Sequence, residues 1–560
     1  SEADALAALT TRPAEWSGVA DQLGVIAPGR LANLTVVRGS YFDPEAQVSE
    51  VWIEGRNYPL TDPAAKPPEK AKADEKKSAE PPAARVARSP LEERGPILAP
   101  PAVLFRNATI WTSGPEGILH GQDLLLAGGK VAGVGETGTV RLNAPDQLVE
   151  VDATGLHLTA GLIDAHNHSY ILGSVNEGTL PSTAMVRIGD VVNSESPQIY
   201  EQLAGGLTAA SLLHGSANPI GGQNAVVKLR WGAGPEEMII ADAPPGIKFA
   251  LGENVKQSNW GENRRSRFPQ TRMGVPVFMA NRFTAAQQYL AAWQRFAAGQ
   301  GPQPRRDLEL ETLGEIIEGK RLIHCHSYRQ DEIVAFLRVM ESFGVKVGTL
   351  QHILEGYKVA DEIAAHGAGA SAFADWWGFK YEVIDAIPYA GAIMHDRGVL
   401  VSFNSDSSDH ARRLNREAAK AVKYGGVPEV DALNFVTINP ARQLGIGHRT
   451  GSLEVGKDAD VAVWSGHPFA PETVCLQTWI DGQKYFDRAL EPERVTRLQS
   501  ERSALLARAK KTSDTKKDEP AGEAKKSEAA RALFFRQALE NSRHFQYSCC
   551  EAHDSLNLKP

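Results

Sequence analysis

The sequence has few cysteines, no long apolar run and no excess of positive charge. Its four cysteines are too few and too irregularly spaced for a disulfide framework, and they leave the redox compartment open. No apolar stretch approaches the ~20 residues that cross a bilayer, so we expect no membrane span. A net charge of −8 with both signs interspersed creates no basic field, and we therefore expect no nucleic-acid partner.

The first residues are acidic and lack the basic start and apolar stretch of a signal peptide. Either the protein is cytosolic or its beginning has been removed, so we expect a soluble protein and leave open whether it is cytoplasmic or periplasmic. At 560 residues, with 42% hydrophobic and 23% charged residues, the composition is that of a globular protein with more than one domain. This length accommodates a β/α barrel of ~250 residues together with smaller modules.

The start of the chain repeats a segment near its other end. Residues 1–58 align without a gap on residues 428–485, and the match includes several glycines. A Trp-Ile-x-Gly motif begins at Trp52 in one copy and at Trp479 in the other. Each copy predicts a short helix followed by glycine-punctuated strands. We infer that the chain begins within the tail of an earlier, related module; a duplicated β accessory piece is the alternative.

The middle of the chain, from about Leu158 to Asn439, alternates apolar strands with helical segments. This alternation is typical of a parallel β/α architecture. The predicted fold class is therefore α/β, with a (β/α)8 TIM-like barrel. The eight candidate strands are Leu162–His168, Leu207–His214, Ala225–Leu229, Gly246–Leu251, Arg321–His326, Val345–His352, Gly369–Ala374 and Val399–Ser405. The glycine-rich residues 221–224 are expected to form a turn before the third of these strands.

Polar side chains that can bind a metal lie at the carboxyl ends of these strands. His166 and His168 follow the apolar run 156–163, and residues i and i+2 of a strand project from the same face, so both rings can point at one position. Other strands carry Lys248, His324, His326, His352 and Asp406, and His214 is a looser candidate. Each has an ordinary structural explanation when taken alone. A metal site, however, requires such residues to converge on one barrel mouth, and imidazole and carboxylate ligands suit zinc.

These motifs together resemble the amidohydrolase superfamily, in particular its imidazolonepropionase-related and Xaa-Pro-dipeptidase-like members. The resemblance covers about residues 97–490, and residues 1–60 match the family's C-terminal segment a second time. It implies a small composite β-sandwich made by the segments that flank the barrel. The expected domains are a C-terminal segment of a preceding module at 1–61, a disordered linker at 62–96, sandwich segments at 97–157 and 439–490, the barrel at 158–438 and a charged, partly disordered tail at 491–560.

The resemblance also implies roles for the strand-end residues. His166 and His168 would hold one metal, while His352 and His324 would hold a second. His326 is the alternative to His324, and the family's use of the first histidine favours His324. Lys248 would bridge both metals as a carbamate formed with carbon dioxide. If Lys248 is unmodified, one metal would be held by the histidines and Asp406. The expected cofactor is a divalent metal, zinc by preference, with one or two ions per chain.

The expected reaction is hydrolysis of a C–N bond in a small-molecule amide, cyclic amide or dipeptide-like substrate. A metal makes hydroxide available at neutral pH, and Asp406 would pass the water's proton to the leaving nitrogen. Two other interpretations are a mononuclear deaminase or cyclic-imidate hydrolase and a catalytically silent scaffold. The linker and tail suggest a homo-oligomer or a larger parent chain. Weaker candidates for substrate contact are Asn254, Arg264, Arg265, Arg272 and Tyr328.

Overall fold

The computed structural model describes residues 2–43, 46–59, 97–140, 148–261, 267–375 and 380–515. The chain divides into two compact units, Ser1–Val86 and Ala87–Pro560. The expected linker at 62–96, the candidates Arg264 and Arg265, and the tail beyond Thr515 lie outside the described residues.

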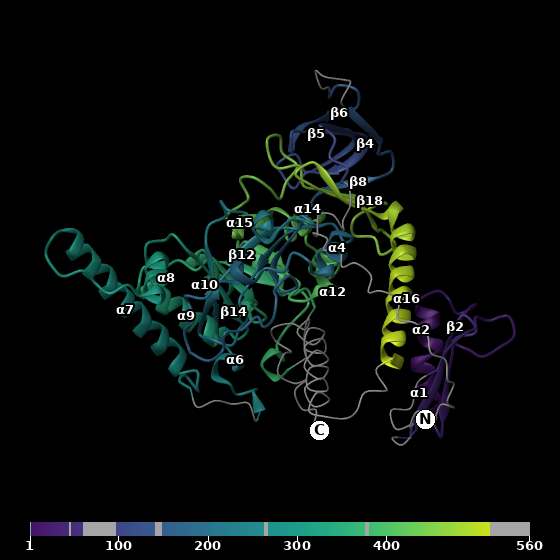
Figure 1. Cartoon of the computed structure of the whole chain (residues 1–560), viewed down its shortest axis with the longest axis horizontal. Coiled ribbons are helices and arrows are strands. Elements are labelled where there is room, and N and C mark those ends of the chain that lie inside the picture. Colours follow the sequence, from purple (N-terminus) through teal and green to yellow (C-terminus); the bar gives the residue numbers. More distant parts are fainter. Residues whose placement is uncertain are drawn as a thin grey trace. The chain divides into compact units, whose positions relative to one another are not determined.

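Parallel strands alternate with helices in the second unit, as the sequence predicts (Figure 1). One sheet contains β9 (Leu162–Asn167) paired in parallel with β10 (Leu207–Leu212). A larger sheet holds a parallel run of strands that ends close to the residues expected to bind metal. The run consists of β13 (Gly246–Ala250), β14 (Leu322–Ser327), β15 (Thr349–His352), β16 (Gly369–Ala372) and β17 (Val401–Phe403).

The expected closed eight-stranded barrel is not seen, because the described strands fall into a three-stranded and a six-stranded sheet, both mixed. The expected third barrel strand, β12 (Ala225–Lys228), runs antiparallel to β10. The short connection between β10 and β12 contains no helix, and a parallel return needs a longer crossover. The predicted turn at 221–224 is also wrong, since β11 (Ile220–Gln223) pairs antiparallel with β13.

Helices connect and cover these strands. Helix α9 shows why they form where they do: it buries Ile333, Phe336, Leu337 and Met340, which recur at helical spacing as predicted. The helices around the sheets are α4 (Pro197–Leu203), α5 (Pro235–Met238), α6 (Glu253–Lys256), α7 (Gly274–Ala297), α8 (Leu308–Ile317), α9 (Gln330–Ser342), α10 (Ala360–His366), α11 (Ala390–Asp396), α12 (Ser408–Ala411), α13 (Leu414–Gly425), α14 (Glu429–Asn434) and α15 (Ile438–Gln443).

A third sheet in this unit has eight strands, which come from the segments before and after the β/α region in the sequence. Its central joint is the antiparallel pair of β8 (His157–Ala160) and β18 (Val461–Trp464). Phe105 and Trp479, from the two sides, pack edge to face with ring centroids 5.8 Å apart. The other strands are β4 (Ala102–Trp111), β5 (Ile118–Ala127), β6 (Lys130–Glu136), β7 (Leu148–Asp152), β19 (Cys475–Ile480) and β20 (Gln483–Asp487). The sandwich itself remains a prediction.

A buried ion-pair cluster ties the β/α region to this sheet. Lys228 of β12 is fully buried, and its Nζ lies 2.7 Å from Asp458 Oδ2 and 3.0 Å from Asp460 Oδ2. Asp481 lies against the same ammonium. Burial opposes the ionisation of Asp458, but Lys228, Lys130 and Arg449 outweigh it and lower the pKa of this carboxyl.

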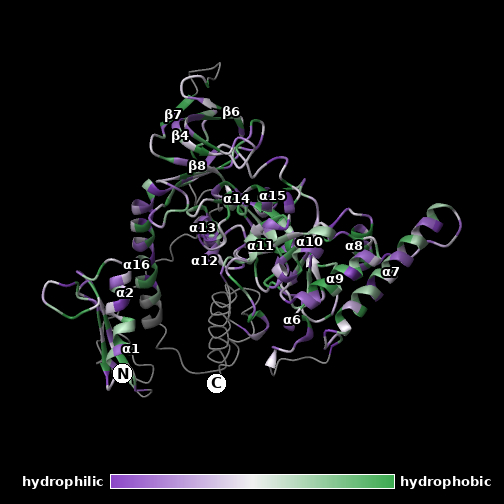
Figure 2. Cartoon of the chain, turned by 180° about the vertical axis from the view of Figure 1, so that it is seen from behind, coloured by the Kyte–Doolittle hydropathy of each residue, from purple (hydrophilic) through white to green (hydrophobic). Residues whose placement is uncertain are grey.

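After the eight-stranded sheet the chain continues as α16 (Glu491–Thr515), which is hydrophilic along most of its length (Figure 2). The first part of the expected charged tail is thus helical as far as Thr515. Among the described residues, no helix combines the length and apolar character needed to cross a membrane.

The first unit repeats the local structure at 428–485. It contains α1 (Glu2–Leu9), α2 (Thr11–Trp16), and an antiparallel sheet of β1 (Leu34–Arg38), β2 (Gln47–Ile53) and β3 (Arg56–Pro59). Aligned residues give the same order in α14, α15, β18, β19 and β20. Gly24 and its counterpart Gly451 both have φ 91°, and a Cβ at either would meet the alanine of the preceding helix within 3 Å.

The two copies differ in how much of their apolar surface is covered. Ile26 is 88% exposed, whereas its counterpart Leu453 is 2% exposed. Ile53 is 50% exposed, whereas its counterpart Ile480 is fully buried in the core of the β/α region. Equivalent sequence positions therefore serve as surface in one copy and as core in the other.

Candidate metal centre

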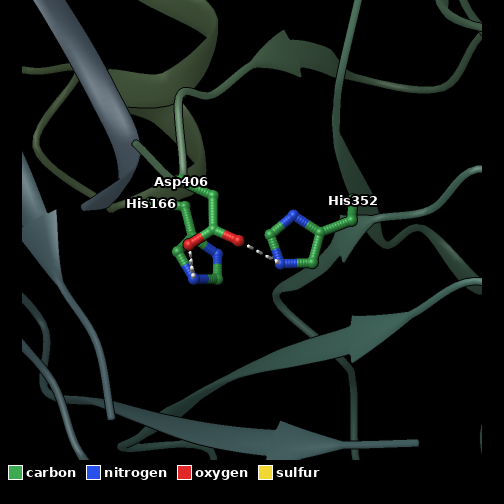
Figure 3. A group of neighbouring side chains, drawn as sticks. All are labelled: His166, His352 and Asp406. Carbon is green, nitrogen blue, oxygen red and sulfur yellow. Dashed lines mark ion pairs between the residues drawn. The ribbon is translucent and has the colours of Figure 1, made fainter. Parts of the chain in front are cut away.

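Three buried side chains from different strand ends converge on one point. His166 at the end of β9, His352 at the end of β15 and Asp406 after β17 place donor atoms within 4.8 Å of one another (Figure 3). Asp406 Oδ1 lies 3.7 Å from His166 Nε2, and its Oδ2 lies 3.6 Å from His352 Nε2. The sequence predicts this convergence, since parallel strands bring their carboxyl ends to the same edge.

His168 and Lys248 complete the same cluster. His168 Nε2 lies 3.1 Å from His166 Nε2 and 3.3 Å from Asp406 Oδ1. The Nζ of Lys248 lies 3.0 Å from His166 Nε2, and the lysine is fully buried. Five of the predicted ligands are thus brought together.

The second ring nitrogen of His166 and that of His168 each have an acceptor, which fixes the tautomer of both rings. His168 Nδ1 donates to the carbonyl of Leu213 at 2.9 Å, and His166 Nδ1 donates to Gln351 Oε1 at 3.1 Å. Both Nε2 atoms then present lone pairs to each other and to the carboxylate of Asp406. A cation between these atoms would stabilise the facing lone pairs, and ligand atoms around tetrahedral zinc lie about 3.3 Å apart. The donor set and its spacing therefore fit a divalent metal.

The structure separates the two histidines of β14. The ring of His326 lies 4.9 Å from that of His352, centroid to centroid, and faces the cluster. The ring of His324 lies instead near Gly246 and Asn224, towards the amino ends of the strands, about 3 Å from where a Cβ on Gly246 would stand. Burial and the charge of Lys248 lower the pKa of His324 to about 4, so it is a neutral imidazole. His326, the alternative, is thus the strand-five histidine beside His352.

The looser candidate His214 has both ring nitrogens occupied. Its Nδ1 donates to the carbonyl of Gly215 at 2.9 Å, and its Nε2 accepts from the amide of Glu177 at 2.8 Å. Burial lowers its pKa to about 4. His214 is therefore a structural histidine.

Several supporting residues were not predicted as part of the site. Gln351 binds His166, and Phe373 stacks on His352 with centroids 4.6 Å apart. Asp164 accepts hydrogen bonds from the backbone of His166 and Ser405, and so joins the ends of β9 and β17. The position of Asp164, two residues before His166 in the same strand, could have identified it from the sequence. Nothing in the local sequence distinguishes Gln351 or Phe373 as part of the site.

Backbone strain occurs at two of the converging residues. His352 has φ 67° and Asp406 has φ 43°, conformations that residues other than glycine seldom adopt. In a regular strand, consecutive side chains point to opposite faces. The turn at His352 breaks this alternation and lets Gln351 and His352, which are neighbours in sequence, both reach the cluster.

The described substrate-contact candidates have different surroundings. Tyr328 lies beside the cluster, with its ring centroid 4.5 Å from that of His326. Asn254 donates to Ser216 Oγ at 2.7 Å. Arg272 is ion-paired with Glu332 at 2.5 Å, which leaves it less suited to hold a substrate carboxylate. Of the described candidates, only Tyr328 is shown in contact with the metal-cluster residues.

Comparison with known proteins identifies relatives of the chain. Residues 379–492 match the amidohydrolase family model. The crystal structure of an amidohydrolase from Thermotoga maritima MSB8 is 34% identical and superimposes with a TM-score of 0.63, over 69% of this chain and 100% of that one. Amidohydrolase tasK of Hapsidospora irregularis is 29% identical over 426 residues, which are 69% of this chain and 43% of that protein. A urease subunit alpha of Photorhabdus laumondii is 39% identical over 90 residues, 13% of this chain and 16% of the subunit. The chain thus spans less than half the length of either curated relative.

Proposed function

We propose that this chain, which belongs to the amidohydrolase family, hydrolyses a C–N bond of a small molecule with the help of a bound divalent metal. The observation that carries the proposal is the convergence of His166, His168, His352 and Asp406, whose nitrogen and oxygen atoms are spaced as metal ligands. Amide, cyclic amide and dipeptide-like molecules are the substrate class.

The ligands divide into two groups around Asp406. His166 and His168 would hold one metal together with Asp406, and His352 with His326 would hold a second. Lys248, whose Nζ lies 3.0 Å from His166 Nε2, would bridge the two as a carbamate formed with carbon dioxide. Zinc suits this mixture of imidazole and carboxylate donors. When bound, the metal supplies Lewis acidity and makes hydroxide available near neutral pH.

Asp406 is the residue that we expect to move the proton. Its carboxylate is buried, and Oδ1 and Oδ2 lie toward different histidines, at 3.3 Å from His168 and 3.6 Å from His352. An oxygen of Asp406 would accept a proton from the attacking water and return it to the leaving nitrogen. Tyr328 lies next to the cluster, where it can orient the substrate.

The second candidate function is that of a mononuclear deaminase or cyclic-imidate hydrolase. It applies if Lys248 is not carboxylated. In that case, the ammonium of Lys248 would itself act as the cation beside His166 Nε2. The two forms differ in stoichiometry, with two metals per chain in the first and one in the second. A silent scaffold would bind no metal and have no activity.

The test measures metal content by elemental analysis and hydrolysis of N-acyl amino acids, dipeptides and cyclic amides. We expect His166→Ala to lose metal and activity together. Asp406→Asn should lower kcat by about 10²–10⁴-fold, the contribution of a positioned acid–base group, and mass spectrometry under native conditions with carbon dioxide should detect the modified Lys248. Normal turnover by a metal-bound Asp406→Asn enzyme would contradict the proton-transfer role.

A further inference from the structure

A cleft of about 510 Å³ lies outside the metal cluster, and none of the cluster residues lines it. It is bordered by α4, the segment after Asp406 that contains α12, the strands β18 and β19, and the start of α16. Figure 1 labels α4, α12, β18 and α16. This volume is within the range of small-molecule sites, about 300–1,000 Å³.

The lining of the cleft is rich in arginine. Five guanidinium groups face three carboxylates there, although the chain as a whole has a net charge of −8. The arginines are Arg412, Arg413, Arg416, Arg488 and Arg494. Positive charge is thus concentrated in one hollow of an acidic protein, which raises the local concentration of anions.

The carboxylates neutralise this charge incompletely. Glu491 accepts a hydrogen bond from Tyr200 at 2.6 Å and lies 3.9 Å from Arg494. Asp409 is 3.4 Å from Arg412, and both side chains are largely exposed. Arg413 makes no ion pair with any residue that the structure describes. Arg412 and Arg413 therefore retain hydrogen-bond donors for a ligand.

Two of the arginines, Arg488 and Arg494, are held in place by neighbouring groups. Arg488 donates to the carbonyls of Cys475 at 2.6 Å and Ala204 at 3.0 Å. The guanidinium of Arg494 lies 3.8 Å from the ring centroid of Tyr200. A fixed guanidinium loses little freedom when it binds, and its planar donors match the oxygens of phosphate or carboxylate groups. We propose that this cleft binds a small molecule with at least two oxyanion groups, either phosphates or carboxylates.

Helices α4 and α12 border the cleft and also contact residues next to the metal cluster. On α4, Tyr200 and Glu201 line the cleft, while Gln202 accepts a hydrogen bond at 3.0 Å from Asn167, the residue between His166 and His168. Gln202 also donates to the carbonyl of Ser408 at 3.5 Å, at the start of α12. Arg413 follows α12 and immediately precedes α13, and Arg494 of α16 lies over the ring of Tyr200 in α4. An anion that bridges Arg413 and Arg494 would therefore connect the segments next to both helices.

The experiment is calorimetric titration of the full chain with inorganic pyrophosphate and with citrate, at constant ionic strength set by chloride. We expect saturable binding of at least one probe, and which one binds distinguishes a phosphate source from a carboxylate source. The double variant Arg412→Gln, Arg413→Gln should weaken binding at least tenfold. Arg338→Gln, an exposed arginine of α9 outside the cleft, is the matched control and should bind normally.

Two further measurements separate this cleft from the metal centre and from general unfolding. His166→Ala should keep the affinity for the probe, because the metal cluster does not line the cleft. Bound probe should slow amide exchange in α12 and at the start of α16. Absence of saturable binding, equal affinity in the double variant, or loss of binding in His166→Ala would each overturn the proposal. None of these readouts depends on the proposed hydrolysis.

Discussion

Asp164 and Ser405 are joined by two hydrogen bonds, with Ser405 Oγ donating to Oδ2 at 2.6 Å and Ser405 N donating to Oδ1 at 3.0 Å. The same carboxylate accepts from the His166 amide and from Asn167 Nδ2. The backbone N–H groups of His166 and Ser405 and the side-chain amide of Asn167 can only donate, so Asp164 accepts from each of them. It fastens the strand end that carries His166 and His168 to the turn that carries Asp406.

Replacing Asp164 tests whether this link positions the metal cluster. Asp164→Asn would turn an amide donor towards other donors and should cost about 1–3 kcal/mol in the free energy of unfolding. Metal affinity should fall about 10–100-fold, as for residues that orient metal ligands. Urea unfolding and metal titration give the two values. Asp190→Asn, at an exposed ion pair with Arg187, is the control and should change neither; unchanged metal affinity in Asp164→Asn would contradict the positioning role.

The two histidines of β14 make a matched pair for the second metal. His326→Ala should reduce the metal content per chain, because the ring of His326 faces His352. His324→Ala should keep the metal, since this ring lies towards Gly246. Elemental analysis of both variants decides between them. The opposite result would restore His324, the histidine that the family resemblance favours.

The ion-pair cluster around Lys228 should make stability depend on pH. Asp458→Asn leaves the buried Lys228 with less compensating charge and should cost about 3–5 kcal/mol at pH 7. The folded pKa of Asp458 is lowered, so the stabilisation is complete above the unfolded value of ~3.9 and is lost as the pH falls below it.

The measurement is therefore urea unfolding of the wild type and of Asp458→Asn from pH 7 down to pH 3. We expect the difference between their free energies of unfolding to become smaller below pH ~4. Asp242→Asn removes an exposed partner of Arg449 and should cost less than ~1 kcal/mol. If the difference in free energy of unfolding between the wild type and Asp458→Asn stayed constant over this range, the carboxylate charge of Asp458 would not stabilise the fold.

The repeated segments allow one substitution to be compared in two environments. Ile480→Ala should cost about 2–5 kcal/mol, because it removes fully buried methyl groups from the core. The same change at the counterpart, Ile53→Ala, should cost much less, because half of that side chain is already exposed. Hydrogen exchange resolved by segment would measure each cost within its own unit. Similar costs at both sites would mean that Ile53 is covered in solution.

Local sequence patterns were enough to predict most of the strands and the strand-end residues. Apolar runs ending in His166, Lys248, His352 and Asp406 identified the strands that carry the cluster, because a parallel arrangement brings such ends together. The antiparallel course of β12 was not predicted, since hydrophobic periodicity does not report strand direction. The preference for His324 over His326 came from the family resemblance and not from the local pattern, because both side chains lie on the same face of β14 and differ only in depth.

The sequence by itself determined that the chain is an α/β protein with a repeated segment and with histidine, lysine and aspartate side chains near the ends of its strands, since periodicity, composition and spacing are properties of the chain alone. Only the tertiary structure decided which atoms meet. Residues distant in sequence, such as Gln351 for His166 and Ser405 for Asp164, set the tautomer and orientation of the ligands. The positive φ at His352 depends on that packing, because the surrounding fold must offset its strain.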